Sequence, residues 1–235
     1  MIRADGSHQV GMGHVFRMAN LARALDRAGI GPVAFCGIWD RQVETWLRQR
    51  DFAVEILADD VVNLTHMAAW LKVCAAEVVI NDILDTDADY MEEIKDSGCR
   101  IVNFDDNGLG RDLADCNINA LPSNMPTEAG AAVVFSGPDY LLLSAEFSPD
   151  TRGRKITSTP SSILVTLGGS DTYGNTLVAV TALQKCNKLQ KIDIITGPAF
   201  RHWDELSDLV IGDRRCVVHG TVPSLANFCL LYTSD

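Results

Sequence analysis

The feature that most constrains the fold is a glycine-containing loop between a short extended segment and an amphipathic helix near the N-terminus. Residues 3–17 read RADGSHQVGMGHVFR, and apolar residues at helical spacing predict a helix over 14–28. Gly11 and Gly13 lack a Cβ where the chain turns into this helix, so a ligand can approach the backbone there. The free amides of the first helical turn favour negative charge. The stretch therefore predicts an α/β domain with a ligand site at the helix start.

His14 stands at the mouth of this helix, and histidine is the side chain that most readily exchanges protons near neutral pH. It is a candidate general base; the alternative is a polar helix-start residue bonded to a backbone carbonyl. Arg17, one turn later, either faces a carboxylate or phosphate or lies on a solvated helix face. Asp5 and Ser7 either bind a sugar or stabilise the turn through side-chain to backbone hydrogen bonds.

The loop departs from the dinucleotide-binding fingerprint, because Phe16 occupies the position of its third small residue. The longer string R-A-D-G-S-x-x-x-G-x-G-H-x-x-R resembles the start of the UDP-sugar hydrolases of pseudaminic acid biosynthesis and the related SpsG-like proteins of spore-coat polysaccharide synthesis. The resemblance implies that His14 is the catalytic base. We expect the substrate-binding residues to be Asp5, Ser7, Gly11, Gly13, Arg17 and Asp82.

Strand and helix patterns alternate along the whole chain, which predicts parallel sheets with right-handed crossovers. The resemblance implies an α/β, GT-B-like fold of two Rossmann-like domains with a cleft between them, the second domain incomplete. We expect a first domain over 1–147, ending in a strand at Cys116–Ala120, a linker over 148–162, and a partial nucleotide-binding domain over 163–228. Residues 229–235 are expected to be a non-native tail.

A second strand, glycine turn and helix occur at the start of the expected second domain. Gly168, Gly169 and Ser170 follow an apolar strand, and glycines before a helix N-terminus suit a diphosphate. The resemblance implies that this loop faces the pyrophosphate of UDP, so these three residues are the expected nucleotide-binding site. Asp171 is expected to cap the next helix.

Three carboxylates follow predicted strand ends, where open α/β sheets bind ligands: Asp82, Asp105 and Asp106. Paired carboxylates can act as acid and base or hold magnesium, but we favour the interpretation that they stabilise turns and caps. In the resembled hydrolases an active-site tyrosine follows the strand that ends here at Ile80. This chain lacks that tyrosine, and Tyr90 lies too far along to replace it.

Composition excludes several classes of function. The formal net charge of −11 argues against a nucleic-acid binder, and the seven cysteines contain no C-x-x-C pair that would predict zinc. Residues 1–5 lack the apolar core of a signal peptide, and no apolar run approaches the roughly 20 residues of a membrane helix. We expect a cytoplasmic enzyme without metal, cofactor or membrane insertion, whose partners are a UDP-sugar substrate and a fused or associated enzyme of the same sugar pathway.

The resemblance implies the first of three functions, and two alternatives stay open beside it. The first is hydrolysis of a UDP-linked diacetamido-trideoxyhexose to UDP and the free sugar. The second is glycosyl transfer on the same fold by an SpsG-like or related enzyme, with an acceptor hydroxyl in place of water. The third is an inactive fragment of either enzyme.

Overall fold

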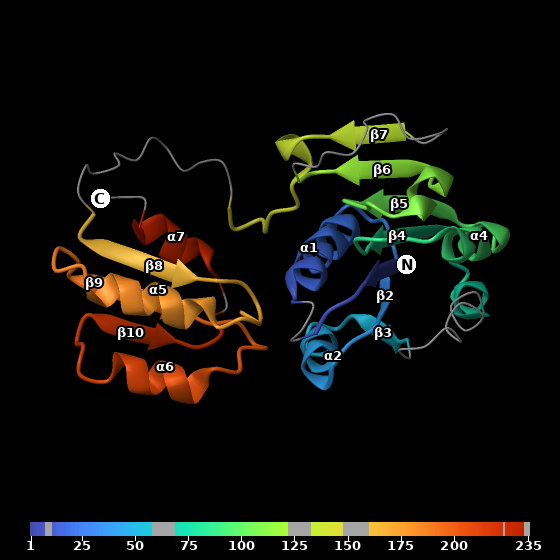
Figure 1. Ribbon diagram of the computed structural model, residues 1–235. Coiled ribbons are helices and arrows are strands. Elements are labelled where there is room, and N and C mark those ends of the chain that lie inside the picture. The colour runs from blue at the N-terminus through green and yellow to red at the C-terminus, as the bar shows by residue number, and fades with distance from the viewer. Residues whose placement is uncertain (8–10, 58–68, 122–132, 148–159, 223, 233–235) are drawn as a thin grey trace. The chain divides into compact units, whose positions relative to one another are not determined.

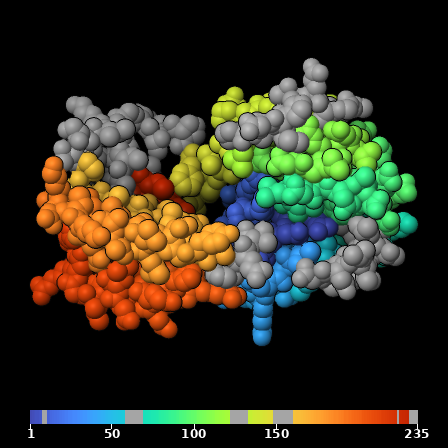
Figure 2. Space-filling model, viewed as in Figure 1, coloured from blue at the N-terminus to red at the C-terminus, as the bar shows by residue number. Residues whose placement is uncertain are grey.

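The computed structural model describes residues 1–7, 11–57, 69–121, 133–147, 160–222 and 224–232 (Figure 1). The chain divides into two compact units, Met1–Gly6 with His14–Leu143 and Ser7–Gly13 with Ser144–Asp235. Each unit has its own parallel sheet and its own core, and Figure 2 shows the atoms of both units in space-filling form. The predicted domain boundaries, drawn from the sequence, stay predictions.

The first unit is built on a parallel sheet in the order β3-β2-β1-β4-β5-β6-β7. Its strands are β1 (Ile2–Ala4), β2 (Ala34–Gly37), β3 (Ala53–Ile56), β4 (Val78–Asp82), β5 (Arg100–Phe104), β6 (Cys116–Asn119) and β7 (Val133–Ser136). The strand order reverses between β1 and β4, and such a switch point is where open α/β sheets bind ligands at the carboxyl ends of their strands.

Helices cover both faces of this sheet (Figure 1). They are α1 (Gly13–Arg27), α2 (Arg41–Arg48) and α4 (Ala88–Asp96), with 3-10 turns η1 (Leu109–Leu113) and η2 (Pro138–Tyr140). The predicted helix over 14–28 is confirmed as α1, which buries Val15, Met18, Ala19 and Ala22. Asp40 and Asp87 begin α2 and α4 as side-chain N-caps.

A row of polar residues crosses the sheet beneath the switch point. Arg3 pairs in register with Asn81, Asn81 with Asn103, and Asn103 with Asn117. Successive side chains of a strand point to opposite faces, so Asn81 and Asp82 face opposite sides of the sheet. Asn81 donates to Oδ1 of Asn103 at 3.0 Å. Asp82 lies on the face covered by α1, because it bonds to His14 of that helix, and Asn81 therefore lies on the other face.

The second unit has a parallel sheet in the order β10-β9-β8. Its elements are β8 (Ser162–Thr166), α5 (Asn175–Gln184), β9 (Lys191–Ile195), α6 (Trp203–Val210), β10 (Cys216–His219) and α7 (Ala226–Tyr232). Its core packs Val165 and Ile194 of the sheet against Val180 of α5 and Leu206 of α6. The strand, glycine turn and helix predicted at the start of this half are confirmed as β8, the turn at 168–170 and α5.

One prediction about the first unit is wrong. Residues 116–120 do not end its sheet, because β7 pairs in parallel with the outer side of β6. The run Val133–Ser136 is only four residues long, and so short an apolar run gives no clear period. Most of the predicted linker, 148–159, lies outside the described residues, as do residues 233–235 of the predicted tail, while α7 includes 229–232. Among the helices in the described ranges, none has the length and apolarity needed to cross a membrane.

Candidate functional site

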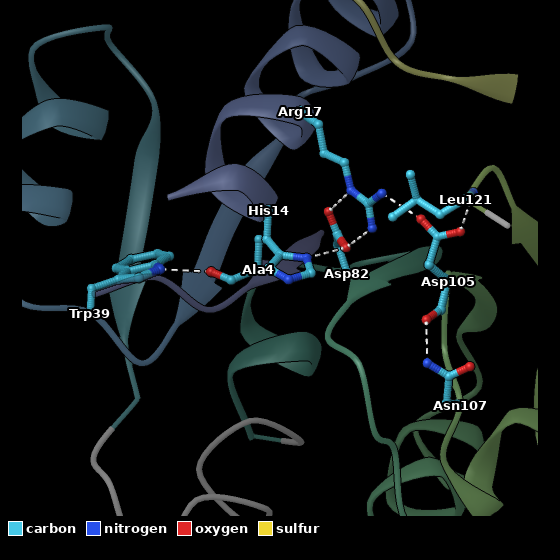
Figure 3. A network of polar contacts seen from close by, with 8 residues as sticks. All are labelled: Ala4, His14, Arg17, Trp39, Asp82, Asp105, Asn107 and Leu121. Atoms are coloured by element: carbon cyan, nitrogen blue, oxygen red, sulfur yellow. Dashed lines mark hydrogen bonds and ion pairs between the residues drawn. The ribbon is translucent and has the colours of Figure 1, made fainter. Parts of the chain in front are cut away.

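The candidate site lies at the carboxyl ends of β1, β4 and β5 in the first unit (Figure 3). His14 occupies the first turn of α1, Asp82 ends β4, and Asp105 follows β5. These side chains converge because β1 and β4 are neighbours and α1 begins just beyond β1 in the chain. The topology thus brings together residues that are far apart in the sequence.

His14 and Asp82 form a hydrogen-bonded pair, with 2.7 Å between Nδ1 and Oδ1. The Asp82 side chain is fully buried and that of His14 is 20% exposed. Asp82 also accepts hydrogen bonds from Arg17, so its carboxylate is an acceptor and the imidazole proton belongs on Nδ1. That tautomer leaves Nε2 of His14 with the basic lone pair.

Arg17 lies between two carboxylates (Figure 3). Its Nε donates to Oδ2 of Asp82 at 2.5 Å, its Nη2 to Oδ1 of Asp82, and its Nη1 to Oδ2 of Asp105 at 2.5 Å. Burial opposes the positive charge, but the hydrogen bonds and charges of Asp82 and Asp105 outweigh it and raise the pKa of the guanidinium. Arg17 is thus bound by two carboxylates of the protein itself rather than lying on a solvated helix face, and its predicted contact with a substrate stays a prediction.

Asp105 and Asp106 have different surroundings. Asp106 accepts from the backbone amides of Thr86 at 3.0 Å and Gly108 at 2.9 Å, as expected of a turn-stabilising acid. Asp105 does more than stabilise a turn. Its Oδ1 accepts from the amide of Leu121 at 3.0 Å, but its Oδ2 pairs with Arg17. Asp105 therefore belongs to the same network as His14.

The predicted residues Asp5, Ser7 and Gly11 make hydrogen bonds that stabilise the loop between β1 and α1. Oδ1 of Asp5 accepts from the amide of Ile38 at 3.0 Å, and its Oδ2 lies 3.4 Å from Nη2 of Arg3. Ser7 and Gly11 exchange two backbone hydrogen bonds of 3.2 and 2.7 Å. Gly11 has φ of +91°, a conformation that glycine adopts without strain. Their contact with a substrate stays a prediction.

Gly13 is the first residue of α1, and a Cβ added there would meet no atom within 4 Å. Packing within the protein therefore does not require glycine at this position. Its expected contribution, room for a ligand beside the backbone, stays a prediction.

Trp39 and Tyr90 were not among the predicted site residues. Trp39 donates from Nε1 to the carbonyl of Ala4 at 2.7 Å, and its ring packs so tightly on Gly37 that a Cβ there would lie 2.6 Å from Nε1. This bond joins the end of β1 to the residues that follow β2. A lone tryptophan in a loop gives no sequence signal that predicts such a bond. Tyr90 is buried on α4 and donates from its hydroxyl to Oδ1 of Asn81 at 2.7 Å, and burial raises the pKa of its phenol.

The predicted nucleotide loop lies in the second unit. Gly168 has φ of +80°, and the carbonyl of Gly169 accepts from the amide of Ala199 at 2.9 Å. Ser170 is buried, with its Oγ 3.2 Å from Oγ1 of Thr172. The loop packs directly on the turn after β9, because a Cβ on Gly197 would lie 2.3 Å from Cα of Gly169.

Gly174 occupies the N-cap position of α5, and the expected capping by Asp171 comes from its carboxylate three residues earlier. Its two carboxylate oxygens accept from the amides of Asn175 at 2.9 Å and Thr176 at 2.8 Å. These amides of the first helical turn are occupied by a protein carboxylate. A phosphate at this loop therefore needs donors from 168–170 rather than from the start of α5.

Within the described ranges, no three histidine, cysteine, aspartate or glutamate side chains are arranged to hold a metal ion. The chemistry available at the network is that of a histidine held by a buried carboxylate.

No protein-family model matches the chain. An uncharacterized protein of Methanocaldococcus jannaschii, MJ1062, is 28% identical over 219 residues, which cover 89% of this chain and 44% of that protein. The spore coat polysaccharide biosynthesis protein SpsG of Bacillus subtilis is 29% identical over 175 residues, covering 72% of this chain and 50% of SpsG. The chain thus spans about half the length of the curated relatives it matches.

Solved structures give a clear answer on the fold. MurG of Acinetobacter baumannii matches 100% of this chain and 70% of its own, with a TM-score of 0.62 and 12% identity. The spinosyn rhamnosyltransferase SpnG matches 94% of this chain and 70% of its own, with a TM-score of 0.59 and 12% identity. The fold is that of the GT-B glycosyltransferases. The expected α/β, GT-B-like class is therefore confirmed, and at these identities the GT-B likeness concerns the fold alone.

Proposed function

We propose that this protein acts on a UDP-linked sugar and releases UDP by hydrolysis, with Nε2 of His14 as the general base. The observation that carries the proposal is the 2.7 Å bond from Nδ1 of His14 to the buried Asp82 at the switch point of the sheet. The likeness to SpsG and to glycosyltransferase structures supports a nucleotide-sugar substrate.

In the proposed reaction a water molecule gives a proton to Nε2 of His14 as its oxygen attacks the anomeric carbon. The bond from that carbon to the diphosphate oxygen breaks, and its electron pair leaves with UDP. Asp82 holds the imidazole in the productive tautomer and stabilises the imidazolium that forms, as the carboxylate of a catalytic triad does. Since both oxygens of Asp82 are engaged, we now assign it this positioning role rather than direct contact with the sugar.

The leaving diphosphate needs charge stabilisation more than protonation, and preorganised backbone donors supply this well. We assign that role to the loop Gly168, Gly169 and Ser170. Asp171 keeps the first amides of α5 occupied, so the loop itself must provide the donors.

A neutral sugar suits the network around His14. The positive charge of Arg17 is already paired with Asp82 and Asp105. A negatively charged sugar would therefore be repelled by these two carboxylates without a free cation to offset them. The diacetamido-trideoxyhexose implied by the resemblance is neutral and is the first sugar to test.

The second candidate is a glycosyltransferase, favoured by the likeness of the fold to the spinosyn rhamnosyltransferase SpnG and to MurG. The same His14 would then deprotonate an acceptor hydroxyl instead of water. The two functions differ in whether UDP release requires an added acceptor.

The test is UDP release from the UDP-linked diacetamido-sugar by the 235-residue chain in H₂¹⁸O without acceptor. Hydrolysis at the anomeric carbon predicts steady UDP release, with UDP free of ¹⁸O because the oxygen bridging the sugar and the diphosphate leaves with UDP. Release only after acceptor addition would establish the transferase instead. UDP carrying ¹⁸O would show attack at phosphorus and overturn the proposed chemistry.

A further inference from the structure

We infer that Asp105 is a positioning residue for His14, acting through Arg17. This inference rests on the proposed role of His14 as base. Asp105 does not touch His14: its Oδ2 bonds Nη1 of Arg17, and Arg17 in turn holds both oxygens of Asp82. The guanidinium is a rigid planar fork, so fixing one end fixes the direction of the other.

Arg17 and Asp82 are held to each other by a bidentate fork, and Asp105 anchors this pair from the other side. Nε and Nη2 of Arg17 bond to Asp82, and the Nη1 bond to Asp105 supplies the remaining constraint. With the guanidinium held on both sides, the carboxylate of Asp82 has one orientation toward Nδ1 of His14. Loss of Asp105 would remove the outer anchor, so that Arg17 and the Asp82 carboxylate bonded to it could shift together relative to Nδ1 of His14.

Asp105 has an unfavourable backbone conformation, which indicates that its side-chain bonds offset a conformational cost. Its φ is +49°, in the left-handed region that is unfavourable for a residue with a Cβ and is tolerated best by glycine, asparagine and aspartate. Its amide is fixed by the carbonyl of Ile118 at 2.9 Å. Glycine would satisfy this backbone, but only a carboxylate also reaches both Arg17 and the amide of Leu121.

The bond to Leu121 extends the network to the chain leaving β6. Oδ1 of Asp105 accepts from that amide at 3.0 Å, while the side chain is only 7% exposed. One carboxylate thus ties the end of β5 to α1 and to the segment after β6. The placement of that segment and the orientation of the His14–Asp82 pair are thereby coupled.

Asp105→Asn is the informative variant. Asparagine tolerates the backbone conformation and keeps an oxygen for Leu121, but it removes the charge that holds Arg17. We expect kcat for UDP release to fall by about 10-fold with KM within about 2-fold, the size seen when supporting partners of functional groups are removed. The matched control is Asp115→Asn, since Asp115 accepts from the amide of Ile101 at 2.8 Å at the opposite end of β5.

A double-mutant cycle with Arg17→Lys tests the route of the effect. Lysine cannot bridge two carboxylates as the guanidinium does, so the two substitutions should be strongly non-additive in kcat if Asp105 acts through Arg17. Additive effects would overturn the inference.

A readout independent of activity separates this inference from the proposed function. The Nδ1 proton of His14 bonded to Asp82 should give a downfield ¹H NMR signal at low temperature, assigned by its absence in His14→Asn. We expect Asp105→Asn to shift or broaden that signal and Asp115→Asn to leave it in place. An unchanged signal in Asp105→Asn would overturn the inference even if the parent hydrolyses the sugar nucleotide, and a changed signal would support it even if the parent does not.

Discussion

The hydroxyl of Tyr90 donates a hydrogen bond to Oδ1 of Asn81 inside the first unit, on the face of the sheet opposite Asp82. Asn81 precedes Asp82 in β4, so this bond supports the strand end that carries the candidate site. Tyr90 therefore has a structural task on that face of the sheet.

Tyr90→Phe should destabilise the protein without disabling it. The change leaves Oδ1 of Asn81 buried without this donor, which costs about 1–3 kcal/mol in the free energy of unfolding. The measurement is urea unfolding together with the rate of UDP release well below the transition. Tyr140→Phe is the control, because Tyr140 is 38% exposed and should change neither. A Tyr90→Phe protein of parent stability but low activity would assign Tyr90 to the chemistry instead.

Asp82→Asn should reduce kcat by on the order of 10²-fold or more, because the amide cannot hold the His14 tautomer and balance the imidazolium as a carboxylate does. Steady-state kinetics of UDP release check this, with Asp112→Asn as the control since the Asp112 side chain is 60% exposed. A parent-like kcat in a folded Asp82→Asn protein would show that the Asp82 carboxylate does not support His14 in catalysis.

Gly197→Ala should weaken UDP binding. An added Cβ would lie 2.3 Å from Cα and O of Gly169, so the proposed nucleotide loop must move. Isothermal titration with UDP measures the effect, and we expect at least about a 10-fold loss of affinity, since the displaced amides no longer reach the diphosphate. Gly220→Ala is the control in the same unit, because its nearest atom would be Cη2 of Trp203 at 3.9 Å. Unaltered UDP affinity in Gly197→Ala would count against the loop as the nucleotide site.

Asp213 should make the second unit sensitive to acid. Hydrogen bonds from Arg215 lower the pKa of Asp213 from its ordinary value of 3.8. A carboxylate with a lowered pKa stabilises the folded state fully above that ordinary value, and the contribution is lost as pH falls through the lower folded value. Thermal unfolding below about pH 4 should therefore show a falling Tm in the parent.

The matched variant is Asp213→Asn, which should have a lower Tm than the parent at neutral pH and a smaller decrease in acid. A variant whose Tm follows the parent at every pH would show that the Asp213–Arg215 pair does not contribute to stability.

Much of the fold follows from sequence patterns because its elements carry strong signals. The helical spacing of apolar residues in 14–28 matched α1 closely, and the apolar strand predicted to end at Ile80 continues in the structure through Asp82 as β4. Strand β7 was missed because four residues define no period, and its pairing with β6 depends on tertiary context.

The residues of the candidate site were also predictable only where a local sequence signal marks them. His14 and Arg17 were found because they lie in one local motif, and Asp82 because it follows a strand. Their mutual bonds, and the inclusion of Asp105, depend on strand order, which brings β4 beside β1 and β5 beside β4. A sequence shows which carboxylates end strands but not which of them share an arginine.

The most direct test of the central claim is the rate of acceptor-free UDP release by His14→Asn relative to the parent. His219→Asn is the matched control, because His219 makes a 2.7 Å bond to the buried Asp193 in the second unit and has no assigned part in the reaction. We predict a loss of about 10²–10⁴-fold for His14→Asn, the usual contribution of a general base, and a parent-like rate for His219→Asn. Parent-like UDP release by a folded His14→Asn protein would contradict the account.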